Sequence, residues 1–228
     1  MILFFRRLFP ALAGALLLLS SFVAEPAEAR VEKPFRQSGI ASWYGSWHHG
    51  KVTANGEAYD MFAMTAAHKT IPLGTLVKVT RKDIGRSLVV RINDRGPYKR
   101  RRIIDLSFAA ADSLQMKRKG VTRVTIEVVG DKSGRLLSDR HEFFVRLKDE
   151  EPTGKAIQRQ IARLTRLGMN DAASLLHVQD DVMALGPFRT FEDAQSALIR
   201  VATTHPGASI MLAEKGSMMP AVNAVASK

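Results

Sequence analysis

Residues 89–107, VVRINDRGPYKRRRIIDLS, change from strand-forming to turn-forming types within a few positions. Val-Val-Arg-Ile alternates as a half-buried strand does, and Asn-Asp-Arg-Gly-Pro is a cluster of turn formers. Asp94 is therefore expected where a strand runs into a turn. An Asp in such a turn often only bonds its own backbone. The alternative is a catalytic carboxylate that a rigid scaffold presents.

Short strand signals continue on both sides of this stretch, from Gly39 to about Gly130. Residues 83–86 predict a hairpin turn, and Ser107 is expected to cap one small helix over 107–114. Many short strands with a single helix predict a compact β-barrel or sandwich over 39–130. The expected strands cover residues 39–45, 75–80, 87–93 and 121–129.

After Gly130 the pattern changes to alternating strands and helices. Following a linker over 131–140, the order is β-α-β-β-α-β, as in the ferredoxin-like split unit. This second domain is expected over 141–213, and residues 214–228 are expected to form a flexible tail. The predicted strands lie at 141–147, at two places within 174–188 and at 208–212, and the predicted helices at 155–167 and 190–202, the second capped by Thr190.

The N-terminal residues 1–29 have the features of a signal peptide. Arg6 and Arg7 precede a Leu- and Ala-rich core, and Ala27-Glu28-Ala29 supplies small residues for a signal peptidase. We expect a cleaved secretory signal rather than a retained membrane anchor, followed by a polar linker over 30–38. The mature protein is then expected in the periplasm.

The composition excludes some kinds of chemistry. The chain contains no cysteine, so disulfides, thiol catalysis, thiolate metal sites and lipid attachment through Cys are not expected. Its net charge of +12 favours a polyanionic partner. For an exported chain, anionic lipid surfaces and the peptide carboxylates of the cell wall are better candidates than nucleic acid.

Four titratable residues are the candidate catalytic set: Glu57, Asp60, His68 and Asp94. Carboxylates and an imidazole that converge on one groove suit the cleavage of a glycosidic bond, in which one carboxylic acid protonates the leaving oxygen. Spacing does not show that they converge. Solvated surface positions for Glu57 and Asp60, and a structural role for His68, remain the alternatives. No paired ligand spacing supports a metal site, and no cofactor is expected.

Three aromatic residues near the first strand are candidates for sugar stacking: Trp43, Tyr44 and Trp47. On a strand Trp43 and Tyr44 face opposite sides, so one can belong to the core while the other is exposed. Exposed aromatic rings beside carboxylates commonly stack on sugars, and core packing is the alternative for at least one of them.

Residues 39–129 resemble the rare lipoprotein A (RlpA) family of septal-ring lytic transglycosylases. The matching strings are GIASWYG, TANGEAYDMFAMTAAHKTIPLGTLVKVT, GRSLVVRINDRGPY and RIIDLSFAAADSL. The resemblance implies a six-stranded double-psi β-barrel. It also implies endolytic cleavage of the MurNAc–GlcNAc β-1,4 bond in peptide-stripped glycan strands, leaving 1,6-anhydroMurNAc ends, in cell division and daughter cell separation. Division proteins are then expected partners.

The family's active-site positions fall on Glu57, Asp60, His68 and Asp94. We expect Asp94 to be the general acid, Glu57 and Asp60 to tune it and to stabilise oxocarbenium-like charge, and His68 to orient it. Arg95 is expected to face substrate carboxylates or another acidic group, because a guanidinium turned towards Asp94 would lower the pKa of an acid catalyst. Arg95, Trp43 and Tyr44 are the expected substrate-binding residues.

The chain departs from the family in lacking a lipobox cysteine, so an outer-membrane lipid anchor is not expected. The basic run Lys99–Arg102 is either a solvated face or an aid to binding acidic wall components. Residues 141–213 resemble, more weakly, a SPOR domain, which binds peptide-stripped septal glycan. The alternative to an enzyme is a non-catalytic septal scaffold whose barrel only binds peptidoglycan.

Overall fold

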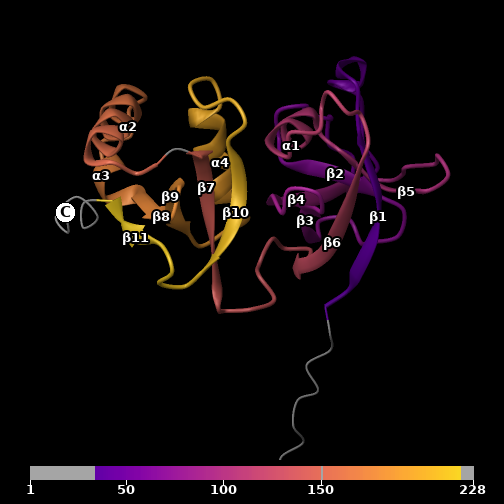
Figure 1. Cartoon of the computed structure of the whole chain (residues 1–228). Coiled ribbons are helices and arrows are strands. Elements are labelled where there is room, and N and C mark those ends of the chain that lie inside the picture. Colours follow the sequence, from indigo (N-terminus) through magenta and orange to yellow (C-terminus); the bar gives the residue numbers. More distant parts are fainter. Residues whose placement is uncertain (1–33, 150, 222–228) are drawn as a thin grey trace, which may run out of the picture. The chain divides into compact units, whose positions relative to one another are not determined.

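The computed structural model describes residues 34–149 and 151–221 (Figure 1). The predicted signal peptide and the first part of the predicted linker lie outside the described residues. Within the described ranges, no helix is both long and apolar enough to cross a membrane.

The first domain is a closed six-stranded barrel with the strand order β1-β5-β2-β4-β3-β6. The pairs β1–β5 and β2–β4 are parallel, and the other neighbours are antiparallel. Alternate residues of each strand point into the barrel, which the apolar side chains of β3 and β4 help to fill. The strands are β1 (Arg36–Trp43), β2 (Thr65–His68), β3 (Leu76–Arg81), β4 (Ser87–Asp94), β5 (Arg102–Leu106) and β6 (Thr122–Gly130).

The barrel and its six strands confirm the expected fold, with differences at the edges. Strand β1 begins at Arg36, so residues 36–38 belong to the barrel and not to a linker. Strands β2 and β5 were not predicted from periodicity. All four residues of β2 are buried, so it shows no alternation, and β5 begins at Arg102, the last residue of a basic run that predicts exposed chain. A short 3-10 helix, η1 (Ser46–His48), follows β1.

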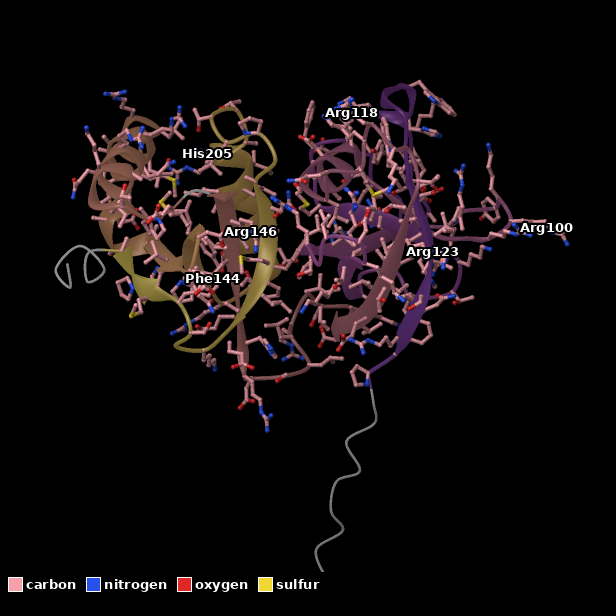
Figure 2. The ribbon with its side chains drawn as sticks, viewed as in Figure 1. Arg100, Arg118, Arg123, Phe144, Arg146 and His205 are labelled. Carbon is pink, nitrogen blue, oxygen red and sulfur yellow. The ribbon has the colours of Figure 1, made fainter. Side chains whose placement is uncertain are left out.

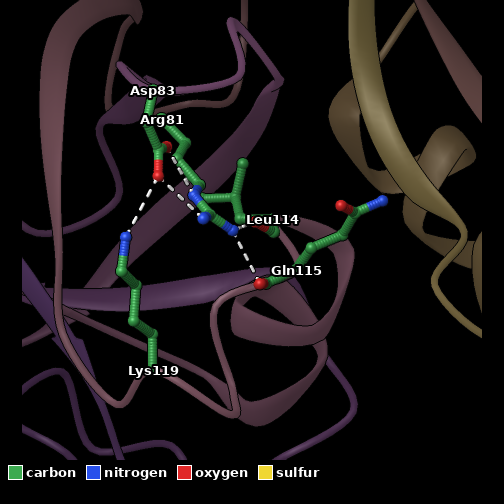
Figure 3. A network of polar contacts seen from close by, with 5 residues as sticks. All are labelled: Arg81, Asp83, Leu114, Gln115 and Lys119. Carbon is green, nitrogen blue, oxygen red and sulfur yellow. Dashed lines mark hydrogen bonds and ion pairs between the residues drawn. The ribbon is translucent and has the colours of Figure 1, made fainter.

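Helix α1 (Phe108–Ser113) begins as predicted, with the Ser107 hydroxyl accepting a hydrogen bond from the Ala110 amide. At its other end, Arg81 Nη1 donates to the carbonyl oxygens of Leu114 and Gln115 at 2.9 and 2.6 Å. Figure 3 shows the same guanidinium held by both oxygens of Asp83, which Lys119 also contacts. The end of β3 is thus joined to the end of α1.

The second domain is a five-stranded antiparallel sheet with the order β10-β7-β9-β8-β11. Strands β7, β8, β9 and β10 follow the βαββαβ order along the chain. In the sheet, β9 lies between β7 and β8, the two strands that α2 and α3 connect. Its core combines Phe143 and Val145 with apolar residues of α2 and α4. The elements are β7 (His141–Asp149), α2 (Gly154–Arg166), α3 (Ala172–Leu175), β8 (Leu176–Gln179), β9 (Val182–Phe188), α4 (Phe191–Val201), β10 (Ser209–Glu214) and β11 (Met219–Pro220).

The expected flexible tail is wrong for residues 214–221. Strand β11 pairs with β8 through Met219–Val178 and Pro220–His177. Met218 and Ala221 on either side of it are buried. Two apolar side chains and one short ladder therefore hold this segment on the sheet, where the sequence showed no period. Residues 222–228 lie outside the described residues.

Candidate functional site

Strand register places two carboxylates on the outer face of the barrel. Asp105 of β5 is paired with Ala67 of β2, which is paired in turn with Asp94 of β4. Strands lie about 4.8 Å apart, so two steps separate the α-carbons of Asp94 and Asp105 by roughly 10 Å. Ile104 and Leu106, on either side of Asp105, are fully buried. Asp105 therefore points away from the core.

A bulge in β4 directs Asp94 to this outer face. Ala66 pairs with Ile92 but Ala67 pairs with Asp94, so Asn93 is an extra residue in β4. Ile92 is buried in the core, and without the extra residue Asp94 would point to the same side as Ile92. The predicted position of Asp94 at a strand end is confirmed, since it is the last residue of β4.

Both oxygens of the Asp94 carboxylate accept hydrogen bonds. Tyr44 Oη donates to Oδ2 at 2.7 Å, and the backbone amides of Ala54 and Arg95 donate to Oδ1 at 2.9 and 2.8 Å. The ring of Tyr44 packs against those of Tyr59 and His48, with centroids 5.1 and 5.0 Å away. The carboxylate is thus fixed in orientation from three directions.

The pKa of Tyr44 lies far above its ordinary value. Burial is the largest cause, followed by the hydrogen bond to Asp94 and the negative charges of Asp94 and Asp105. The Tyr44 hydroxyl consequently keeps its proton at any physiological pH and remains a donor to Asp94.

Residues 54–57 lie along the end of β4 and bring Glu57 to the same face. The Asn55 amide donates to the Asn93 carbonyl at 3.1 Å. The Glu57 carboxylate makes a bidentate ion pair with Arg91 at 2.8 and 2.9 Å. The hydrogen bonds from Arg91 are the main cause that lowers the pKa of Glu57. Glu57 is therefore an ionised group near neutral pH rather than a proton donor.

The other two predicted catalytic residues do not contact Asp94. Asp60 Oδ1 accepts a hydrogen bond from the Phe62 amide at 2.9 Å and forms a local turn. The His68 ring is buried in the barrel wall. Its Nδ1 accepts from the amides of Thr70 and Ile71 at 3.2 and 2.9 Å, and its Nε2 lies 3.1 Å from Gln37 Oε1. Within the described ranges, neither side chain is hydrogen-bonded to Asp94.

Burial is the largest cause that lowers the pKa of His68, to about 4, followed by the positive charges of Arg95 and Lys69. The ring is therefore neutral at physiological pH. Since two amides donate to Nδ1, the proton resides on Nε2 and is donated to Gln37. His68 supports the turn that follows β2.

The three predicted substrate-binding residues lie in different settings. Tyr44 contacts Asp94 directly. Trp43 is half-buried, with its ring edge-on to Phe108 at 5.8 Å. Arg95 donates from Nη1 to the main-chain carbonyls of Ile71 and His68 at 2.8 and 3.2 Å. These carbonyls hold the Arg95 guanidinium against the turn after β2, and among the described residues no acidic side chain is hydrogen-bonded to it. Its contact with substrate carboxylates stays a prediction.

Two further residues of this face were not predicted, Asp105 and Arg91. Ser42 Oγ donates a hydrogen bond to Asp105, and Ser42 itself is buried. The sequence Ile-Asp-Leu contained a signal, because an acid between two apolar residues of a strand faces away from the core. Arg91 carries a weaker signal of the same kind, and nothing in the sequence identifies Glu57 as its partner.

Trp47, in η1, is an exposed aromatic residue near this face. Its side chain is 69% exposed, and Lys51 Nζ lies 4.3 Å from its ring centroid. No group of three or more His, Asp or Glu side chains among the described residues is arranged to hold a metal ion.

The lytic transglycolase family model matches residues 36–126. Three relatives carry the name endolytic peptidoglycan transglycosylase RlpA. The proteins from Vibrio cholerae and Pseudomonas aeruginosa are 57% and 55% identical, over 42% of this chain and over 37% and 28% of their own lengths. The protein from Neisseria meningitidis serogroup B is 38% identical over 72% of this chain and 70% of its own length.

The matched part of the chain thus spans about a third of the Vibrio and Pseudomonas relatives. Similar solved structures include Streptomyces papain inhibitor, 25% identical over 42% of this chain and 96% of its own, with a TM-score of 0.35. Another is the expansin of Clavibacter michiganensis, 18% identical over 50% and 57%, with a TM-score of 0.37. The sequence match to the Neisseria protein extends over two thirds of both chains. The chain therefore belongs to the RlpA family.

Proposed function

We propose that this chain is an endolytic transglycosylase that cleaves the β-1,4 bond between MurNAc and GlcNAc in peptide-stripped strands and leaves 1,6-anhydroMurNAc ends. The names of its RlpA relatives and the matching family model support a peptidoglycan-cleaving enzyme. The observation that carries the proposal is the Asp94 carboxyl group, which a bulge turns outwards and three donors hold in one orientation.

In the proposed reaction Asp94 acts as acid and then as base. Its carboxyl group gives a proton to the glycosidic oxygen, and the bond from that oxygen to C1 of MurNAc breaks. The C6 hydroxyl of the same MurNAc forms the new bond to C1, and Asp94 takes up the C6 proton. Atoms and charges balance without water. An oriented internal hydroxyl has a high effective concentration, which supplies much of the rate.

The other residues of the site are assigned to stabilising the charge of the transition state and to positioning neighbouring groups. We assign Asp105 and the ionised Glu57 to electrostatic stabilisation of the oxocarbenium-like transition state, because both lie on the outer face near Asp94. Tyr44 orients Asp94. His68 and Arg95 brace the turn after β2, and Asp60 holds the 60–62 turn. Trp43 lines the end of β1.

The setting of this activity is part of the proposal. The signal-like residues 1–29 support export to the periplasm. The SPOR-like pattern of residues 141–213 supports binding of peptide-stripped septal strands by the second domain. Together they favour action in daughter cell separation, with division proteins as partners.

The proposal is tested by digesting peptide-stripped sacculi in H₂¹⁸O and analysing the products by mass spectrometry. We expect 1,6-anhydroMurNAc ends without ¹⁸O, because the internal hydroxyl replaces water. Reducing ends that carry ¹⁸O indicate a hydrolase. Binding to sacculi without any product supports the non-catalytic scaffold instead.

A further inference from the structure

The loop between β4 and β5 carries a cluster of exposed cations that the proposed reaction does not use. Lys99, Arg100 and Arg101 are exposed, and the preceding Tyr98 is 86% exposed. In the described part of the chain, none of these three cations takes part in a salt bridge, whereas other cations of the barrel, such as Arg91 and Lys117, do. Figure 2 shows Arg100 at the outer end of this loop.

The loop is a defined turn. The Arg102 amide donates to the Lys99 carbonyl at 3.4 Å. Arg101 has a φ of 67°, a left-handed conformation that is unfavourable for a residue with a β-carbon. A glycine would adopt it without strain. An arginine at this position therefore contributes its charge at the expense of local stability.

The loop lies close to the proposed catalytic acid. It begins directly after Asp94 with Arg95, whose guanidinium is anchored by the carbonyls of His68 and Ile71. Six residues of chain reach at most about 22 Å, so the α-carbon of Arg100 lies within that distance of Asp94. A polymer that binds at Asp94 and extends towards the loop therefore comes within reach of these side chains.

We propose that Tyr98, Lys99, Arg100 and Arg101 bind the ionised lactyl carboxylates of peptide-stripped glycan and make such strands the preferred substrate. This inference rests on the proposed function. In an intact strand each lactyl group of MurNAc is an amide to the stem peptide. Hydrolysis of that amide leaves one carboxylate per disaccharide at a fixed position on the polymer. A row of such charges complements three unpaired cations, and the Tyr98 ring can stack on a sugar face.

An anionic membrane surface is the competing partner for a basic loop. Peripheral binding to lipid generally combines cations with apolar side chains that enter the acyl region. The loop offers one tyrosine and no aliphatic residue among 98–101. The observations therefore favour a polar polyanion.

The test compares two strand preparations with the full-length protein. One is peptide-stripped glycan, and the other is the same glycan with its lactyl carboxylates converted to methylamides by carbodiimide coupling. Each surface ion pair changes affinity by a factor of roughly 1.5 to 5, so three pairs predict a preference of about tenfold for the charged strands. At an ionic strength of about 1 M the Debye length is only about 3 Å, so the preference is expected to disappear.

The variant Lys99→Gln/Arg100→Gln/Arg101→Gly is expected to bind and cleave both preparations equally, and to unfold no more readily than wild type because the glycine relieves the strained turn. A matched control, Lys82→Gln/Arg118→Gln/Arg123→Gln, removes three exposed cations from the barrel. Lys82 and Arg123 lie near the start of β4, about 24 Å of strand away from Asp94. This control is expected to keep the preference.

Equal binding of both preparations by wild type overturns the inference, and so does an equal loss of preference in the control variant. Loop-dependent binding to phosphatidylglycerol vesicles without any strand preference overturns it in favour of a membrane surface. The inference and the proposed function fail separately. Preferential binding without cleavage refutes only the enzyme, whereas cleavage without preference refutes only the role of the loop.

Discussion

At the scale of single residues, the chemistry depends on how side chains are held. Asp94 is oriented by Tyr44 and two amides, and Glu57 is kept ionised by Arg91. These partners separate the roles of two acidic residues that the sequence presents alike. In the proposed reaction Asp94 transfers the proton, while Glu57 supplies a fixed negative charge.

Replacing Tyr44 by Phe removes one of the three donors to Asp94. We expect kcat on peptide-stripped glycan to fall about ten- to hundredfold, with little change in KM, because a misoriented acid transfers its proton poorly. Tyr59→Phe is the matched control, since Tyr59 belongs to the same ring cluster and its hydroxyl contacts the Phe108 amide instead. An unchanged kcat in Tyr44→Phe refutes the orienting role.

Because the pKa of the buried His68 ring is lowered, the protein is expected to lose stability in acid. Its pKa is about 4 in the folded protein and 6.5 when unperturbed, so between these values the unfolded chain binds more protons. Its contribution to stability is therefore complete above pH 6.5 and declines as the pH falls towards 4, by about 1 to 3 kcal/mol. His68→Asn keeps an acceptor for the Thr70 and Ile71 amides but does not titrate.

Urea unfolding at several pH values measures this effect. The free energy of unfolding of His68→Asn is expected to depend less on pH between 6.5 and 4 than that of wild type. His141→Asn serves as the control for a half-exposed histidine. If both variants follow the wild-type slope, His68 is not buried as a neutral ring.

At the scale of secondary structure, bulges and long-range caps determine where functional residues point. The extra residue Asn93 turns Asp94 outwards. Arg81 links the end of β3 to the end of α1, the helix that begins directly after β5. Neither feature follows from periodicity, because each depends on residues far apart in the chain.

Arg81→Ala leaves the carbonyls of Leu114 and Gln115 without the Arg81 donor and removes the Arg81–Asp83 ion pair. Because Arg81 is 8% exposed and its bonds involve a charged group, we expect a loss of about 2 kcal/mol in the free energy of unfolding. Lys119→Ala removes only a surface ion pair to Asp83 and is expected to cost less than about 1 kcal/mol. Equal losses in urea unfolding contradict the capping role of Arg81.

Because β11 pairs with β8, we expect residues 215–221 to contribute to the stability of the second domain. A chain truncated after Glu214 loses the β11–β8 ladder and exposes the surface that Met218 and Ala221 cover. Burying one such apolar side chain contributes about 1.5 to 3 kcal/mol, so a loss of that order is expected. A chain ending at Ala221 retains β11 and is the control. Identical thermal unfolding of both truncated forms contradicts a structural role for this segment.

At the scale of the whole molecule, the sequence predicted the architecture better than the site. Alternating runs such as residues 75–80 and 87–93 correspond to β3 and β4, and Ser107 and Thr190 cap helices as expected. The fully buried β2 has no alternation to detect. Asp105 was missed because β5 was not recognised as a strand, and Glu57–Arg91 because side-chain pairing across 34 positions has no local signal.

The central claim is that Asp94 transfers the proton in bond cleavage, and a single-turnover assay tests it most directly. The rate at which anhydro ends form on defined peptide-stripped strands is compared for wild type, Asp94→Asn and the control Asp112→Asn, whose carboxylate forms an ion pair with Lys117. We predict a rate at least about 100-fold lower for Asp94→Asn and a wild-type rate for Asp112→Asn. A wild-type rate in folded Asp94→Asn protein would contradict the account.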